Sequence, residues 1–169
     1  MNMNRFINQM ADHAERIRLF AQGVSAEQAR WKPAPDSRSI LEVINHLCDE
    51  EREDFRVRLE IILRQSDEPW PPIGPEGWVT ERKYNERDLA ESLNNFLVER
   101  EKTLEWLRSL SSPNWDTVYT SEFGSMSAGD MFASMVSHDL LHLRQLVELH
   151  WAYTVQALQP YQGGYAGDW

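Results

Sequence analysis

Two histidines near the C-terminal end of the chain have the spacing of a metal-binding pair. His138 and His142 are four residues apart, so on a helix their imidazoles lie one turn apart on the same face. Five histidines scattered over 169 residues give such a spacing by chance about one time in seven, and a single inward-facing histidine is more often structural. One cation, however, satisfies both rings of a buried pair. The pair is therefore a candidate metal site.

His46 is the candidate third ligand, because it lies on a second predicted helix and neutral imidazole is the commonest metal-binding side chain. On a helical wheel that starts at Ile40, His46 lies about 60° beyond Val43, at the rim of the apolar stripe. That position fits a ligand at the open end of a helical bundle. It equally fits a partly exposed surface histidine, and the wheel alone leaves both interpretations open.

Three carboxylates lie close to the candidate ligands in the sequence. Glu50 follows His46 by one helical turn, where it can orient the imidazole or accept a proton. For Asp49 we expect a solvated position at the surface of this acidic chain. Asp139 follows His138 directly and points about 100° away from it, which favours a supporting or surface position over a role as a catalytic base.

Three further residues stand out because of their type and position. Arg100 lies in the middle of an apolar helix face, where an unpaired charge is too costly. We expect it to pair with an acid such as Glu51, the alternative being a substrate carboxylate. His13 faces the core of the first predicted helix, and we expect a structural role for it. Cys48 lies about 200° round the helix from His46, so its expected role is packing.

Four long amphipathic helices carry these residues. Apolar side chains recur at spacings of three and four in each helix, and Ser39 and Ser127 begin capping boxes before the two helices that hold the three candidate ligands. The predicted helices cover about residues 6–22, 40–65, 89–107 and 128–155. Strand signals are almost absent. The sequence predicts an all-α fold, a four-helix bundle formed by one domain over residues 1–169 with an irregular tail over 157–169.

The connection over residues 66–86 is the longest between the predicted helices. It contains four prolines, two glycines and the tryptophans Trp70 and Trp78. Connections of this length without structure of their own are usually functional or disordered. The two tryptophans predict a connection that packs against the bundle.

The composition of the chain argues against two classes of binding partner, nucleic acids and membranes. Seventeen basic and 27 acidic residues give a net charge of -10, which repels nucleic-acid phosphates and anionic lipids. No apolar stretch approaches the roughly 18 residues of a membrane span, and the N-terminus has no secretory h-region. The single cysteine agrees with a reducing compartment. We therefore expect a cytoplasmic protein that binds neither nucleic acid nor membrane.

Three segments of the sequence resemble the DinB/YfiT-like family of metalloenzymes, which includes thiol-dependent transferases. The segments are 31–33 (WKP), 39–47 (SILEVINHL) and 137–142 (SHDLLH). The resemblance implies an up-down-down-up bundle with a long crossover between the second and third helices. It also implies a divalent metal held by His46, His138 and His142. Some relatives have a glutamate at one of these positions, whereas this chain has histidine at all three.

A metal with three histidine ligands keeps free coordination positions, which is typical of a catalytic site. Zinc, nickel and iron all accept imidazole ligands. The function we expect is transfer of a low-molecular-weight thiol to a small-molecule substrate, or hydrolysis of that substrate. The alternative is a non-catalytic metal- or ligand-binding sensor or a dimerisation module, and a homodimer is compatible with either function. A ferritin-like di-iron site is excluded because no histidine stands in a Glu-x-x-His motif.

Overall fold

Four long helical segments build the fold in the computed structural model, which describes residues 2–121 and 124–167. They are α1 (Met3–Ala21), the continuous segment formed by α3 (Ile40–Glu50), η1 (Glu51–Phe55) and α4 (Arg56–Arg64), α6 (Leu89–Ser109) and α7 (Ala128–Ala157). The shorter elements are α2 (Ala26–Arg30), α5 (Pro75–Glu81), η2 (Tyr84–Glu86), β1 (Val118–Ser121), β2 (Gly124–Ser127) and η3 (Gly164–Ala166).

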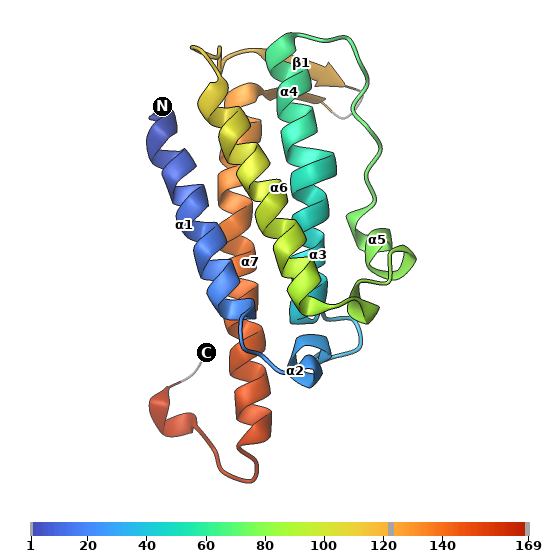
Figure 1. Cartoon of the computed structure of the whole chain (residues 1–169), viewed down its shortest axis with the longest axis vertical. Helices are drawn as coiled ribbons and strands as arrows, with labels where there is room; N and C mark the ends of the chain where they lie inside the picture. The colour runs from blue at the N-terminus through green and yellow to red at the C-terminus, as the bar shows by residue number, and fades with distance from the viewer. Residues whose placement is uncertain (1, 122–123, 168–169) are drawn as a thin grey trace.

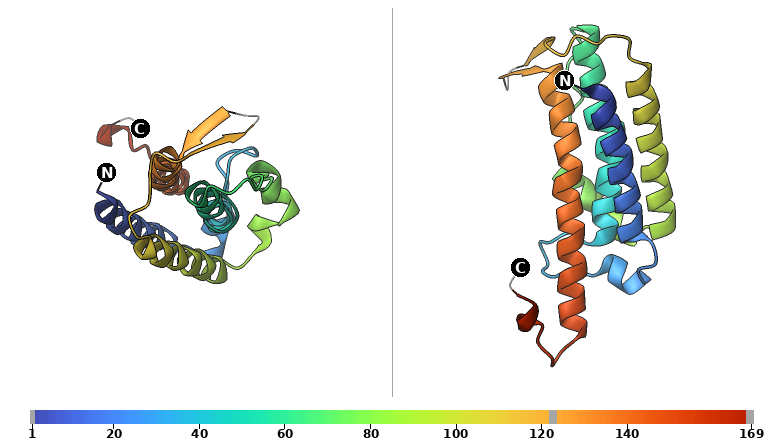
Figure 2. Two further views of the ribbon diagram at one scale, coloured as in Figure 1. Left: turned by 90° about the horizontal axis from the view of Figure 1, so that it is seen from above. Right: turned by 90° about the vertical axis from the view of Figure 1, so that its left-hand side faces the viewer.

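The long segments lie side by side around a common core. In Figure 1, α1 and α7 run downward, whereas α3–α4 and α6 run upward, so the connection from α4 to α6 descends along the side of the molecule. The view from above in Figure 2 shows the four segments grouped around one axis. Helix α6 packs against α1 and α3, and α7 packs against α1 and α4. None of the helices in the described part of the chain has the length and apolar character of a membrane span.

Both predicted capping boxes at the starts of the histidine-bearing helices are confirmed. The Ser39 hydroxyl accepts the backbone N–H of Glu42 at 3.1 Å, and the Glu42 carboxylate accepts the N–H of Ser39 at 3.0 Å. Ser127 and Asp130 form the same reciprocal pair at the start of α7. Each box satisfies backbone donors that have no partner inside the helix. The boxes therefore fix where the two helices begin.

The second long segment is interrupted by a π-helical turn, η1, that the sequence does not predict. Leu59 follows Ile40 by 19 residues, which in a straight α-helix places them about 100° apart. A π turn takes one residue more than an α turn and so removes about that offset. Both residues are fully buried. The π turn thus keeps one apolar face directed at the core along the whole segment.

A two-stranded antiparallel hairpin, β1–β2, corrects the expectation of an entirely helical fold. Val118 pairs with Ser127 and Tyr119 with Met126. Each strand has only four residues, too few for a two-residue alternation to be recognised. The Tyr119 ring stacks on Trp70 with centroids 4.8 Å apart, and its hydroxyl donates to the Glu68 carbonyl at 3.1 Å. The hairpin is held by these contacts with the crossover, which local sequence does not reveal.

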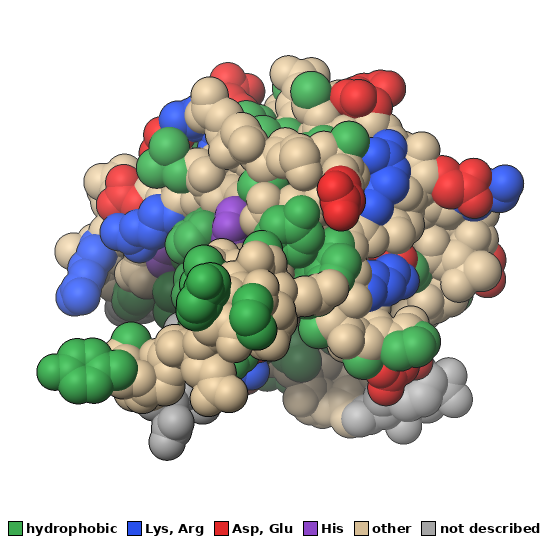
Figure 3. All heavy atoms as spheres, turned by 90° about the horizontal axis from the view of Figure 1, so that it is seen from below, with side chains coloured by type: hydrophobic (Ala, Val, Ile, Leu, Met, Phe, Trp, Pro, Cys, Tyr) green, Lys and Arg blue, Asp and Glu red, His purple; other side chains and the backbone are tan. Residues whose placement is uncertain are grey.

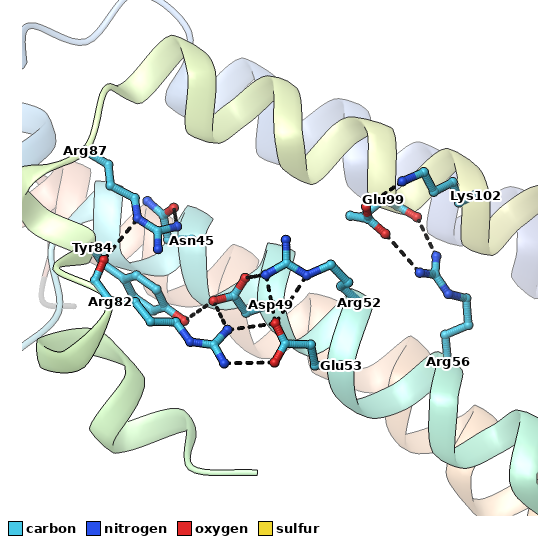
Figure 4. A network of polar contacts seen from close by, with 10 residues as sticks. All are labelled: Asn45, Asp49, Arg52, Glu53, Arg56, Arg82, Tyr84, Arg87, Glu99 and Lys102. Carbon is cyan, nitrogen blue, oxygen red and sulfur yellow. Dashed lines mark hydrogen bonds and ion pairs between the residues drawn. The ribbon is translucent and has the colours of Figure 1, made fainter. Parts of the chain in front are cut away.

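The crossover over residues 66–86 packs as expected, and it contains α5 and η2. Figure 4 shows how its end is attached to the second long segment. The Arg82 guanidinium pairs with Asp49 at 2.6 Å and with Glu53 at 2.8 Å, and the Tyr84 hydroxyl donates to Asp49 at 2.6 Å. Arg52 also donates to Asp49, at 2.7 Å. Our expectation of a solvated Asp49 is wrong: its exposed fraction is 1%, because the crossover covers it and supplies two of its three donors, Arg82 and Tyr84.

The core consists of two apolar clusters with a buried polar layer between them. The lower cluster, named for the end of the bundle where α3 begins in Figure 1, includes Ile17, Val43 and Phe96. The upper cluster, toward α4, includes Met10 and Leu59. The layer contains four titratable side chains, none more than 3% exposed: His13, Glu51, Arg100 and Asp139. Each long segment contributes one of them. The polar layer therefore marks the same level on all four segments.

Candidate metal centre

Three imidazole rings from two helices converge beside this layer. Nε2 of His142 lies 3.1 Å from Nε2 of His46 and 3.0 Å from Nε2 of His138. One nitrogen from each ring lies within 4.8 Å of the other two. His46 is 5% exposed and the other two rings are half-buried. The open question about His46 is thus resolved: its ring points inward, toward the pair on α7.

The spacing of the nitrogen atoms fits a shared cation. Ligand distances of 2.0–2.1 Å with tetrahedral angles place two imidazole nitrogens about 3.3 Å apart, and the two shortest separations in the cluster are close to that value. A hydrogen bond between two Nε2 atoms satisfies only a donor and an acceptor, whereas a cation accepts the lone pairs of all three rings. The donor set therefore fits a divalent metal.

Gln145 selects the metal-binding tautomer of His142. Its side-chain oxygen lies 2.8 Å from Nδ1 of His142, one helical turn further along α7. An amide oxygen only accepts, so Nδ1 carries the proton and Nε2 presents its lone pair to the cluster. Metal-ligating histidines usually donate their second nitrogen in this way. The sequence analysis did not single out Gln145; its position three residues after His142 is the signal that could have shown this role.

All three rings are held in the neutral form that binds metals. Burial lowers the pKa of His46 to about 2 and that of His138 to about 3, and burial is also the main cause of the lowered pKa of His142. The positive charge of Arg38 lowers the pKa of each ring further. Neutral imidazole is the ligand form, so no proton has to be displaced from these rings when a cation binds.

Glu50 lies on the outer side of His46. Its Oε1 is 3.9 Å from His46 Nδ1, and neither atom has a hydrogen-bond partner among the described residues. Burial, together with the neighbouring carboxyl group of Asp54, raises the pKa of Glu50 to about 8. Asp54 is itself paired with Arg58 at 2.8 Å. Glu50 thus lies beside His46, as its position one turn later indicates, but it makes no hydrogen bond to the ring, and its orienting role stays a prediction.

Arg100 forms the buried ion pair that we expected, and a second one. Its Nη2 lies 3.0 Å from Glu51 Oε2 and 2.7 Å from Asp139 Oδ1. His13 Nδ1 lies 3.2 Å from Asp139 Oδ2. Burial opposes the effect, but Arg100 and His13 hold the pKa of Asp139 below its usual value. Asp139 is therefore part of the polar layer, next to His138 in the chain, and it does not face the three histidines as a base.

Phe55 packs beside the histidine cluster, whereas Cys48 lies away from it. The Phe55 ring packs on the His138 ring with centroids 4.9 Å apart. The His46 ring also lies beside the His138 ring, with centroids 5.4 Å apart. Phe55 and His46 lie on opposite sides of a straight α-helix, since nine residues correspond to about 180°. The π turn changes that relation. Cys48 is buried in the lower apolar cluster, which agrees with the packing role expected for it.

A bundle of four helical segments with three histidines gathered between two of them defines a class of candidate metalloproteins. The chain belongs to the DinB superfamily, whose family model matches residues 9–146. The fold is similar to that of YfiT from Bacillus subtilis, described as a probable metal-dependent hydrolase with an unusual four-helix bundle topology, with a TM-score of 0.79 and 14% sequence identity. The match covers 90% of this chain and 87% of YfiT. No protein of curated function matches the sequence.

Proposed function

We propose that this protein is a metal-dependent enzyme that acts on a small molecule, with a divalent cation held by His46, His138 and His142. The observation that carries the proposal is the convergence of three Nε2 atoms, two pairs of which are 3.0 and 3.1 Å apart. Membership of the DinB superfamily and the description of YfiT as a probable metal-dependent hydrolase support it. Zinc, nickel and iron are the candidate ions, because each accepts imidazole ligands.

The reaction we propose is attack of a water molecule or a low-molecular-weight thiol on an electrophilic substrate. A divalent cation with three neutral imidazole ligands retains free positions, where it acts as a Lewis acid and lowers the pKa of a water molecule or a thiol. The chain contributes orientation: Gln145 fixes the His142 ring, and Glu50 lies beside Nδ1 of His46. Burial of the rings excludes water from their outer sides, which keeps the donor set neutral.

Metal analysis of protein purified without an affinity tag tests the first half of the proposal. We expect about one zinc, nickel or iron ion per chain by inductively coupled plasma mass spectrometry, because three neutral imidazoles form an open metal site. The ratio of this ion to protein should fall after dialysis against a chelator and return on addition of the same ion. A protein that neither retains nor takes up a stoichiometric ion would contradict the proposal.

The nucleophile is tested on the metal-loaded protein. Screening low-molecular-weight thiols by thermal shift should show stabilisation that requires the metal if a thiol is the partner. Absence of any thiol effect, combined with metal-dependent hydrolysis of a panel of esters and amides, would assign water as the nucleophile. A loaded protein that turns over neither class of substrate supports the non-catalytic sensor or dimerisation module instead.

A further inference from the structure

A pocket of about 530 Å³ lies beside the histidine cluster, between the segment 33–38 and the C-terminal half of α7. Its volume lies within the range that small-molecule ligands occupy. Gln145, which holds the His142 ring, forms part of its wall. Figure 3 shows that hydrophobic and basic side chains lie next to each other at this end of the molecule. The pocket is therefore adjacent to the proposed metal ligands and large enough for a substrate.

Arg38 is the basic residue of this pocket. It is half-buried, and among the described residues it has no hydrogen bond or ion pair. Most arginines of this acidic chain are paired: Arg52, Arg56, Arg82 and Arg100 each contact at least one carboxylate. The charge of Arg38 reaches all three imidazoles, since it contributes to the lowered pKa of each. An unpaired guanidinium is thus available close to the histidines.

The other walls of the pocket limit the kind of anion that can enter. Asp36 and Glu148 both line it, and Glu148 is paired with Arg144 at 3.3 Å. With Glu148 paired to Arg144, the wall presents one guanidinium, Arg38, and one carboxylate, Asp36, so it lacks the positive charge needed to hold a polyanion such as a nucleoside triphosphate. Leu149 and Trp151, the latter 46% exposed, provide an apolar wall. This combination suits a ligand with one negative charge and an apolar body.

We propose that this pocket binds a small-molecule carboxylate, whose negatively charged group pairs with the guanidinium of Arg38 and whose apolar part packs on Leu149 and Trp151. Guanidinium and carboxylate form two parallel hydrogen bonds when their planes align. The inference of a carboxylate-binding site depends only on the pocket and on Arg38. Its role as the substrate site rests on the proposed function, because only a bound metal makes the neighbouring histidines reactive toward the substrate.

The test uses 3-phenylpropionate and its uncharged analogue 3-phenylpropionamide as probes. Isothermal titration calorimetry is run on the wild-type protein and on Arg38→Met, each with zinc and without metal. We expect the carboxylate to bind the wild-type protein, and Arg38→Met to bind it at least about tenfold more weakly with or without zinc. The affinity for the amide should not change. Arg16→Met, which removes an exposed arginine of α1 outside the pocket, is the matched control and should bind the carboxylate as the wild type does.

Arg38→Lys serves as a second variant, because it keeps the positive charge and should keep a preference for the carboxylate over the amide. Equal affinity of wild type and Arg38→Met for the carboxylate would overturn the inference, as would no binding to the wild type at millimolar concentrations. Binding that requires zinc and is unaffected by Arg38→Met would also overturn it, since the metal would then hold the carboxylate. If the protein binds no metal, the proposed function fails, but carboxylate binding to the metal-free protein still tests the site at Arg38. The two proposals can therefore fail independently.

Discussion

At the scale of single residues, the candidate metal centre depends on which nitrogen of each ring carries the proton. Nε2 of His142 is the shared neighbour of the other two ligands, at 3.1 and 3.0 Å. Gln145 holds the proton on the opposite nitrogen of that ring. Replacing His142, the central ligand, or Gln145, which orients its ring, should therefore change metal binding without changing the fold.

Replacing His142 by alanine should abolish metal binding and leave the helical fold intact. Removal of the central imidazole leaves two ligands, while the apolar clusters that stabilise the bundle do not include this side chain. Metal content together with far-UV circular dichroism measures both effects. His150→Ala is the control, since His150 lies on the same helix and contacts Gln28 and the Phe20 carbonyl instead. Unchanged metal occupancy in His142→Ala would refute the assignment.

Replacing Gln145 by leucine should weaken metal binding about 10- to 100-fold, because the acceptor that fixes the His142 tautomer is lost. Gln145→Glu keeps an oxygen acceptor at that position and should bind the metal about as tightly as the wild type. Competition with a chromophoric chelator measures the affinity of each variant. If the leucine and glutamate variants lost affinity equally, Gln145 would act through packing and not through Nδ1 of His142.

At the scale of elements, the crossover and the π turn give the second long segment its final form. The crossover brings Arg82 and Tyr84 onto Asp49 and Glu53. The π turn brings Phe55 onto the same side as the candidate ligands. Neither feature follows from a helical wheel, because one is a contact distant in sequence and the other changes the period on which the wheel rests.

Replacing Arg82 by methionine should lower the free energy of unfolding by about 1–3 kcal/mol, since a partly buried arginine with two carboxylate partners is lost. Asp49 keeps its contacts with Arg52 and Tyr84, which limits the effect. Urea unfolding measures the change, and hydrogen exchange should be faster in α5. Arg108→Met removes an exposed pair with Glu101 and should cost no more than about 1 kcal/mol. Equal losses in the two variants would show that the crossover is not anchored by Arg82.

At the scale of the whole molecule, the polar layer divides the core into two apolar clusters at one level. Within this layer, Arg100 of α6 is paired with Glu51 on η1 and with Asp139 on α7. Its Nη1 also donates to the Met10 carbonyl of α1 at 3.1 Å. Four segments are thus tied together through one buried guanidinium. Buried ion pairs need not stabilise a fold overall, but we expect this one to set the relative heights of the helices that bring the histidines together.

Replacing Asp139 by alanine should lower the free energy of unfolding by about 3–5 kcal/mol, the cost of leaving a buried charge without a main partner. Chemical denaturation measures the change. Asp12→Ala, at an exposed position of α1, should change the free energy of unfolding by no more than about 0.5 kcal/mol. A loss below about 1 kcal/mol in Asp139→Ala would mean that the layer relaxes or admits water and does not hold the helices in place.

The sequence by itself determined the features that depend on neighbours along the chain. Apolar residues at spacings of three and four predicted the long helices, and Ser39 and Ser127 predicted where two of them begin. The spacing of four positions from His138 to His142 predicted that their rings share one face. These predictions hold because helix geometry and capping are set by residues within one or two turns of each other.

Only the tertiary structure decided where distant residues meet. The wheel left His46 between the surface and the core, and the packing of α3 beside α7 turned its ring inward. Asp49 became buried because the crossover covers it, and the hairpin formed because Tyr119 has Trp70 to stack on. Such contacts join residues tens of positions apart, and their free energy comes from burial and pairing that no local pattern encodes.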